Sequence, residues 1–272
     1  LRLIARRTWR FFETFVTATD HMLPPDNFQE DPVPVVAHRT SPTNLGLYLL
    51  SVVSARDFGW IGTTEAIKRL EATLATMDGL ARFRGHFYNW YDTRDLRPLD
   101  PPYISSVDSG NLAGHLIALA NACQEWRTLP VEEGLRLAGI EDALELLGDE
   151  ANLLRDGPRT QTVTWHQFDD ARIRLAGDLR RAPVDGGARL VALGTQAETL
   201  ADIARALATE RGDDAGADMV FWAEAVRGSI ETHRRDLDQS TQALNSAQAR
   251  LAVLEASARA TALAMEFDFL LD

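Results

Sequence analysis

Residues 41–56 read SPTNLGLYLLSVVSAR, and this stretch decides the class of fold. Ser41 is a residue type favoured as a helix N-cap, and Pro42 suits the first helical position because no N–H donor is needed there. The following residues, 45–53, are apolar on nearly every side of a helix. A helix without a polar face is buried on more than one side. The stretch therefore predicts an inner helix of a layered helical fold.

A second stretch of the same kind covers residues 108–126, beginning at Asp108 or Ser109. Alternation typical of strands occurs only at residues 34–37 and 267–271, so the fold is predicted to be all-α. Two inner helices, each preceded by a polar and aromatic loop, predict part of a toroid followed by a helical bundle. The other helices, most of them with amphipathic stripes, are expected at residues 3–17, 64–78, 131–138, 140–154, 164–181, 188–211, 215–235 and 236–260.

Charge and cysteine content exclude several classes of function. The 272 residues include 28 Lys+Arg and 40 Asp+Glu, which gives a formal net charge of -12. Such a surface does not neutralise phosphates, so neither nucleic acid nor an anionic membrane surface is the expected partner. The single cysteine, Cys123, excludes an internal disulfide and a cysteine-based zinc site. No apolar run approaches the roughly 18 residues of a transmembrane helix.

Residues 85–115, GHFYNWYDTRDLRPLDPPYISSVDSGNLAGH, combine aromatic rings with carboxylates and amides. An aromatic face packs against the C–H face of a sugar ring, and short polar side chains bind its hydroxyls. Binding pockets are typically apolar with a few convergent polar groups. The alternative is a compact loop that buries its own aromatic side chains. Composition alone leaves both interpretations open.

Three short segments supply the candidate binding residues. Arg39 and Asn44 lie at the N-terminus of an inner helix, where they would bind hydroxyls or merely cap the helix and form a buried pair with a carboxylate. Asp108 is favourably placed near the positive end of a helix dipole, or is only the cap. His115 follows Asn111 by four residues on one helix face, although a lone helix histidine is more often a core residue.

Glycoside cleavage requires two carboxyl groups about 5–5.5 Å apart for retention or about 6.5–9.5 Å apart for inversion. Asp92 and Asp108 are the pair that the aromatic stretch offers, and they are weak catalytic candidates because a sequence gives no distance. His86 and His115 lack the spacing to carboxylates that a metal site would show, so no metal is predicted. No glycine-rich phosphate loop, HExxH or GxSxG motif occurs in the chain.

Long runs of the chain resemble the bacterial cyclic β-1,2-glucan synthases, at the start of their central glucoamylase-like domain. The likeness is dense over residues 6–127, rests on helical character alone over 128–260, and returns in ATALAMEFDFLLD at 260–272. We therefore expect a piece of a longer protein. The runs that carry the likeness are RTWRFFETFVTA (7–18), LPPDNFQEDP (23–32), HRTSPTNLGLYLLS (38–51), ARDFGWIG (55–62), LEATLATMDGL (70–80), FRGHFYNWYDT (83–93) and SSVDSGNLAGHLIALANAC (105–123).

The resemblance implies a fold and a division into domains. The glucoamylase-like domain is expected to be an (α/α)6 toroid, to which residues 1–127 contribute the first helices. Residues 128–260 would be a helical insertion, and 261–272 would re-enter the toroid. The resemblance also implies a bacterial inner-membrane protein, with this segment as a soluble part on the cytoplasmic side that makes no direct membrane contact. The remaining domains of the parent chain, including a phosphorylase-like domain, would be its partners.

The resemblance also implies an activity. The parent protein has a membrane-embedded glycosyltransferase that uses UDP-glucose, whereas this segment is expected to need no cofactor. The glucoamylase-like domain is implicated in the transglycosylation that closes the glucan ring. Its catalytic carboxylates are expected downstream of this chain, which alone would be inactive. The alternatives are a β-1,2-glucan hydrolase and a non-catalytic helical scaffold or glucan-binding module.

The residues that the resemblance and the helix face together assign to β-1,2-glucan binding are Arg39, Thr40, Ser41, Asn44, Asn89, Trp90, Tyr91, Asp92, Asp108, Ser109, Asn111 and His115. On this assignment Asp92 and Asp108 bind substrate more than they act as acid or nucleophile. If outer helices of the parent cover this segment, its inner helices should expose apolar surface when the segment stands alone.

Overall fold

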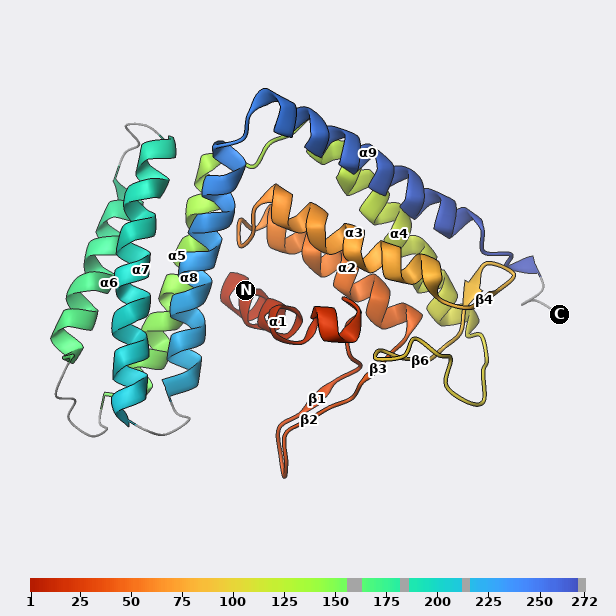
Figure 1. The fold of residues 1–272 in the computed structure, drawn as a ribbon, viewed down its shortest axis with the longest axis horizontal. Helices are drawn as coiled ribbons and strands as arrows, with labels where there is room; N and C mark the ends of the chain where they lie inside the picture. Colours follow the sequence, from red (N-terminus) through yellow and green to blue (C-terminus); the bar gives the residue numbers. More distant parts are fainter. Residues whose placement is uncertain (156–162, 182–185, 212–215, 269–272) are drawn as a thin grey trace. The chain divides into compact units, whose positions relative to one another are not determined.

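A computed structural model describes residues 1–155, 163–181, 186–211 and 216–268 (Figure 1). Helices dominate these residues, and each strand is two residues long, so the prediction of an all-α fold is confirmed. The toroid stays a prediction. The helices are α1 (Arg2–Phe15), α2 (Pro42–Asp57), α3 (Thr63–Gly79), α4 (Ser106–Trp126), α5 (Glu133–Leu153), α6 (Trp165–Arg180), α7 (Gly186–Arg211), α8 (Ala217–Leu237) and α9 (Thr241–Leu263).

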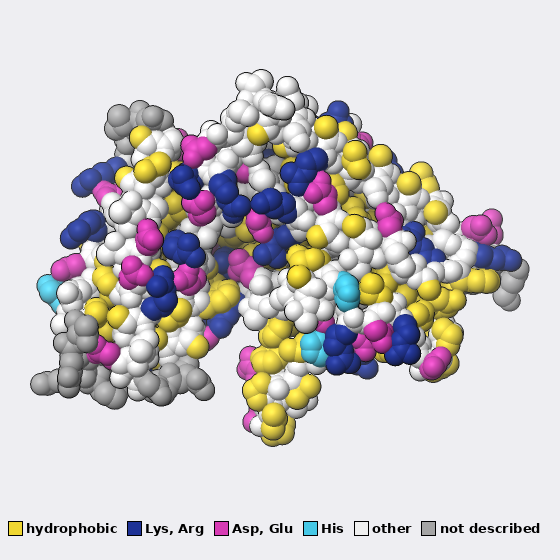
Figure 2. Space-filling model, viewed as in Figure 1, with side chains coloured by type: hydrophobic (Ala, Val, Ile, Leu, Met, Phe, Trp, Pro, Cys, Tyr) yellow, Lys and Arg dark blue, Asp and Glu magenta, His cyan; other side chains and the backbone are white. Residues whose placement is uncertain are grey.

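Three antiparallel strand pairs and one short 3-10 turn, η1 (Ala18–Asp20), complete the described elements. The first pair forms a hairpin on which hydrophobic side chains gather (Figure 2), among them the exposed Val33 and Val35. None of the helices among the described residues is long and apolar enough to cross a membrane. The pairs are β1 (Phe28–Gln29) with β2 (Val35–Val36), β3 (Arg39–Thr40) with β6 (Tyr91–Asp92), and β4 (Arg82–Phe83) with β5 (His86–Phe87).

Contacts divide the chain into two compact units. The first unit holds Leu1–Arg6, Ala55–Glu65 and Val131–Ser240, and the second holds Arg7–Ser54, Ala66–Pro130 and Thr241–Asp272. Residues 241–260 therefore lie with the second unit, because α9 packs along α4. The sequence instead groups them with the bundle. The predicted domain boundaries at 127/128 and 260/261 stay predictions.

The first unit is a bundle of α5, α6, α7 and α8 around one apolar core. Its core is rich in leucine and alanine, with the large side chains of Phe168 and Trp222 fully buried. Each such leucine or phenylalanine contributes about 1.5–3 kcal/mol when it leaves water. The sequence predicts two helices over 131–154, but α5 is continuous through Gly139.

Gly139 is inside α5 because a backbone segment lies directly against it. The connector of residues 55–65, between α2 and α3, belongs to the first unit and brings Gly59 onto this face of α5. A Cβ on Gly139 would overlap the carbonyl of Gly59. Gly59 itself has φ +77°, a conformation that glycine adopts without strain. Gly139, which separates two predicted helices in the sequence, is thus the point at which the backbone of Gly59 approaches α5 closely.

Replacing Gly139 by alanine tests this contact. The added methyl must displace the connector backbone, so we expect Gly139→Ala to lower the free energy of unfolding by about 1–3 kcal/mol. Gly177 of α6 is the matched control, because a Cβ at this position would meet no atom within 4 Å. Gly177→Ala should raise stability by up to about 1 kcal/mol through helix propensity. Equal urea midpoints for the two variants would contradict the assignment.

Two buried polar side chains fasten the connector and the N-terminus to the bundle. The carboxylate of Asp142 accepts hydrogen bonds from Arg2 (2.6 Å) and from the indole of Trp60 (2.7 Å). The ring N–H at Nε2 of His233 donates to the carbonyl of Gly59 at 2.8 Å. Burial lowers the pKa of His233 below its ordinary value of 6.5, because a charged imidazolium loses solvation there.

This lowered pKa gives the first unit a defined pH response. The unfolded state binds a proton on His233 near pH 6.5, whereas the folded state resists protonation until a lower pH. Stability is therefore complete above about pH 6.5 and falls as the pH drops below it. Urea unfolding should show that the free energy of unfolding differs less between pH 5 and pH 8 for His233→Gln than for the unchanged chain. An identical pH dependence in both proteins would contradict the burial of a neutral imidazole.

The second unit is built on the two predicted inner helices. α2 begins as expected, with the Asn44 N–H donating to the N-cap oxygen Oγ of Ser41 at 3.2 Å. Its residues Leu45, Leu49 and Val52 are fully buried. α4 buries one face and packs along α9. Each inner helix still leaves an apolar side chain in solvent: Leu47 is 50% exposed and Ile117 is 43% exposed.

The chain beyond α9 returns to the aromatic stretch within the same unit. The N–H of Glu266 donates to the carbonyl of Arg84 at 3.1 Å. The carbonyl of Glu266 lies 2.8 Å from Nε2 of the fully buried His86, and the ring of Phe267 meets that imidazole edge to face. Gly85, with φ +77°, lets the turn between β4 and β5 approach the backbone of Ala264.

Candidate functional site

A polar-aromatic cluster forms where the segments that precede α2 and α4 meet. The β3–β6 pair places Arg39 opposite Asp92 and Thr40 opposite Tyr91. The predicted candidates before α2 are thereby brought beside those of the aromatic stretch, far along the sequence. We use "polar-aromatic cluster" for the connected residues Asp26, Arg39, Thr43, Asn44, Asn89, Trp90, Tyr103 and Asp108.

Arg39 connects the aromatic and acidic sides of the cluster. Its guanidinium carbon lies 4.6 Å from the centre of the Trp90 ring. Two of its nitrogens donate to Oδ2 of Asp26, at 2.8 and 3.1 Å, and the Asn44 amide reaches Oδ1 of the same carboxylate at 3.3 Å. The pairing considered from the sequence is present, but the Arg39 side chain is 49% exposed instead of buried. An exposed pair adds little to stability. The guanidinium has five N–H donors, so it keeps donors for a ligand beside those that bind Asp26.

Asn89 joins three other members of the cluster through its amide. In the orientation that satisfies all its neighbours, its nitrogen donates to Oδ2 of Asp108 at 3.0 Å. Its oxygen then accepts from the indole N–H of Trp90 at 3.0 Å and from the hydroxyl of Tyr103 at 2.6 Å. The Thr43 hydroxyl donates to the other oxygen of Asp108 at 2.5 Å. The carboxylate of Asp108 is therefore held as an acceptor by two different elements.

Asp108 lies in the first turn of α4 but does not cap it. The N-cap is Ser105, whose hydroxyl oxygen accepts from the N–H of Asp108 at 3.2 Å. The helix thus begins about two residues earlier than the sequence predicts. The two carboxylate oxygens of Asp108 accept hydrogen bonds from Thr43 and Asn89. This arrangement suits Asp108 for accepting hydrogen bonds from hydroxyl groups more than for donating a proton.

Asp92 is held by a neighbour in its own turn. Its carboxylate accepts from the backbone N–H of Arg94 at 2.8 Å and from the Arg94 guanidinium at 3.1 Å. These hydrogen bonds hold the pKa of Asp92 below its usual range. A general acid in glycoside cleavage needs a raised pKa, so Asp92 is disfavoured in that role. The two weak catalytic candidates belong to separate hydrogen-bond networks.

Five predicted site residues have buried side chains: Thr40, Ser41, Asn89, Tyr91 and Ser109. Tyr91 is fully buried, its hydroxyl donating to the Ala81 carbonyl at 2.6 Å and accepting from the Tyr88 N–H at 2.8 Å. Burial raises the pKa of Tyr91 far above its ordinary value. Ser41 is the cap of α2. Thr40 and Ser109 are also buried. Asn89 is itself a member of the cluster, and Tyr91, the neighbour of Trp90 in the chain, supports the cluster from the core.

Asn111 and His115 lie on α4, one turn apart. Asn111 is exposed to solvent. The His115 ring lies against Gly46 of α2, and a Cβ added to Gly46 would overlap the Nδ1 atom of His115. Burial lowers the pKa of His115, so the ring is neutral near pH 7. The residue is only partly buried and its Nδ1 has no hydrogen-bond partner among the described residues, so both alternatives considered from the sequence stay open.

Three cluster members are not among the ligands predicted from the sequence: Asp26, Thr43 and Tyr103. Asp26 lies just before the β1–β2 hairpin, and that hairpin returns the chain so that Asp26 faces Arg39 and Asn44. Only the fold brings these groups together. Among the described residues, no three His, Cys, Asp or Glu side chains gather as they would around a metal ion. The prediction that the segment uses no cofactor stays a prediction.

Replacing the buried tyrosine tests the assignment of Tyr91 to the support. Tyr91→Phe leaves the Ala81 carbonyl and the Tyr88 N–H without their partner, so we expect it to cost about 1–3 kcal/mol of unfolding free energy. Tyr103→Phe is the matched control, because Tyr103 is 49% exposed and water can replace its hydrogen bond. Thermal unfolding of both variants gives the comparison. A larger loss for Tyr103→Phe would contradict this arrangement.

No protein-family model matches the chain. A comparison with curated proteins finds the cyclic beta-(1,2)-glucan synthase NdvB of Rhizobium meliloti (strain 1021), which is 44% identical over 278 residues. The alignment covers 99% of this chain. The predicted resemblance to the cyclic β-1,2-glucan synthases is confirmed. The chain spans only about 10% of the length of that synthase.

The alignment with the synthase also extends across residues 128–260, because it covers 99% of the chain. The identity of 44% is an average over the whole alignment, so the expectation that the likeness in this region rests on helical character alone stays a prediction.

Proposed function

We propose that this chain is a glucan-binding part of a cyclic β-1,2-glucan synthase and holds the polymer for ring-closing transglycosylation. The similarity to the synthase from Rhizobium meliloti supports the assignment to such a protein. The observation that carries the binding role is the connected cluster of Arg39, Trp90, Asn89 and Asp108. It combines a ring face with an amide, a carboxylate and a cation, the set of groups that a sugar requires.

The cluster can address both sides of a glucose unit. Trp90 is partly exposed and offers an aromatic face for the sugar's C–H groups. The half-exposed ring of Tyr103 adds a second apolar surface. Asp108 accepts hydrogen bonds from sugar hydroxyls, and Arg39 donates them. Because hydrogen bonds within the protein already orient these groups, little conformational entropy is lost when a glucan binds.

In the parent reaction, the 2-hydroxyl of the glucan's own non-reducing end would form a bond to an anomeric carbon within the same chain. The existing glycosidic bond at that carbon would break, its oxygen would leave with a proton on the released reducing-end piece, and the attacking hydroxyl would give up its own proton to a base. This transfer needs a general acid and a nucleophile or base. Asp92 and Asp108 are both held as acceptors, so we assign them to binding and place the catalytic carboxylates outside this chain. The whole protein would polymerise glucose from UDP-glucose in the bacterial inner membrane, with this segment on the cytoplasmic side. Attack by water instead would give a hydrolase, which releases linear products.

Tryptophan fluorescence tests the binding role. Titration with linear β-1,2-glucan should quench the emission saturably, and Trp90→Ala should remove the response. Four other tryptophans, Trp9, Trp60, Trp126 and Trp222, are buried and should contribute little change. Trp165 is partly exposed in the other unit, so Trp165→Phe is the matched control that keeps the response.

Two results would contradict the proposal. One is quenching that persists in Trp90→Ala and disappears in Trp165→Phe. The other is the absence of any response when circular dichroism shows that the chain is folded. An unrelated linear β-glucan, titrated in parallel, separates recognition of this polymer from general affinity for sugars.

A further inference from the structure

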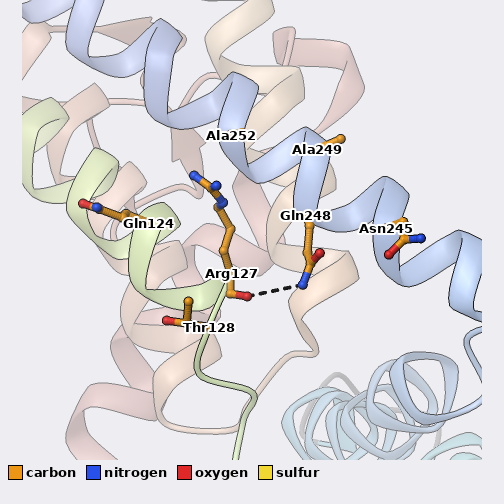
Figure 3. Close-up of a pocket in the computed structure, with 7 residues that line it drawn as sticks. All are labelled: Gln124, Arg127, Thr128, Asn245, Gln248, Ala249 and Ala252. Atoms are coloured by element: carbon orange, nitrogen blue, oxygen red, sulfur yellow. Dashed lines mark hydrogen bonds between the residues drawn. The ribbon is translucent and has the colours of Figure 1, made fainter.

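A groove lies away from the polar-aromatic cluster in the same unit. This groove of about 540 Å³ runs between the C-terminal end of α4 and the first half of α9 (Figure 3). Figure 3 shows Gln124, Arg127 and Thr128 on the α4 side of the groove, opposite side chains of α9. The lining residues are Gln124, Arg127, Thr128, Asn245, Gln248, Ala249 and Ala252.

The walls of this groove are held in place without a ligand. The Arg127 guanidinium reaches from the end of α4 to Glu255 on α9, at 3.1 Å. The Gln248 amide donates to the carbonyl of Arg127 at 3.4 Å (Figure 3). Nearer the middle of α4, Asn121 accepts a hydrogen bond from Arg259 of α9 at 2.7 Å. A cavity between two helices joined in this way is preformed, as binding sites usually are.

The lining chemistry selects a neutral, hydroxyl-rich ligand. The Gln124 and Asn245 amides have no hydrogen-bond partner within the part of the chain that the structure describes. Each amide offers donors and an acceptor, as sugar hydroxyls do. Arg127, the one charged lining residue among those described, is neutralised by Glu255, so the groove does not favour an anion. Ala249 and Ala252 add two small apolar side chains to the lining.

We propose that this groove is a second carbohydrate-binding site, which holds a distal part of the same β-1,2-glucan chain. The choice of ligand rests on the proposed function of the cluster. α4 connects the two sites, since its first turn carries Asp108 and its last turns carry Gln124. At about 1.5 Å per residue, these two positions lie about 24 Å apart along the helix axis. A short oligosaccharide occupies one site at a time, whereas a long chain engages both.

This arrangement makes affinity depend on glucan length. Once a long chain is held at the cluster, its second contact is intramolecular, and the effective concentration raises the overall affinity. The groove would therefore favour long chains over short ones before ring closure. Neither site alone needs to bind tightly to produce this discrimination.

The test removes the two unpartnered amides and measures binding at the other site. Gln124→Ala with Asn245→Ala should raise the Kd for long linear β-1,2-glucan, followed by Trp90 fluorescence, by at least about tenfold. The Kd for a short β-1,2-linked gluco-oligosaccharide should stay unchanged. Gln242→Ala, an exposed amide on α9 outside the groove, is the matched control and should alter neither value. Both altered side chains are exposed, so the double variant is expected to fold.

The outcomes separate the two proposals. An unchanged Kd for long glucan in the double variant, with the Trp90 response intact, would overturn the groove as a site and leave the cluster standing. Equal losses of affinity for long and short glucan would also overturn it, because the change would then act on the cluster itself. If the fluorescence of the unchanged chain responds to neither glucan, the proposed function is refuted instead.

Discussion

The pairing of β3 with β6 is the contact on which the candidate site depends. It is only two residues long, yet it joins the segment before α2 to the aromatic stretch before α4. Side chains alternate across a strand, so Tyr91 points into the core while its neighbours Trp90 and Asp92 point away from it. The buried hydroxyl of Tyr91 therefore helps to fix the position of a partly exposed tryptophan. The hydrogen bonds of Asn89 then extend this order to α4.

Much of the helical framework follows from local physical chemistry. Apolar periodicity and caps such as Ser41 place most helix boundaries within a few residues of those observed. The prediction at Gly139 is wrong because a glycine inside a helix signals a break unless another backbone lies against it, which local sequence does not show. Periodicity also identifies the buried face of α9 but not the helix that covers it, so its packing along α4 was not predicted.

The sequence predicted which segments form the candidate site better than it predicted which of their side chains face a ligand. The aromatic stretch and the segment around Arg39 do lie together, as sugar chemistry suggested. The alternation of residues 89–92 between buried and exposed would have separated Tyr91 from Trp90, had the stretch been recognised as a strand. Asp26 enters the site through the turn of a hairpin, and no pattern in the sequence records that contact. The amides of the α4–α9 groove have ordinary helix surroundings and carry no sequence signal.

The return of the chain after α9 has a practical consequence. Residues 264–268 cover the side chain of His86. They are also hydrogen-bonded to Arg84, in the turn between β4 and β5 that precedes Trp90. Shortening the polypeptide to the end of α9 would admit water to a histidine that is now fully enclosed. The disorder would then reach the polar-aromatic cluster, although no residue of the cluster had been removed. Any trimmed version made for crystallisation or binding work should therefore retain Phe267.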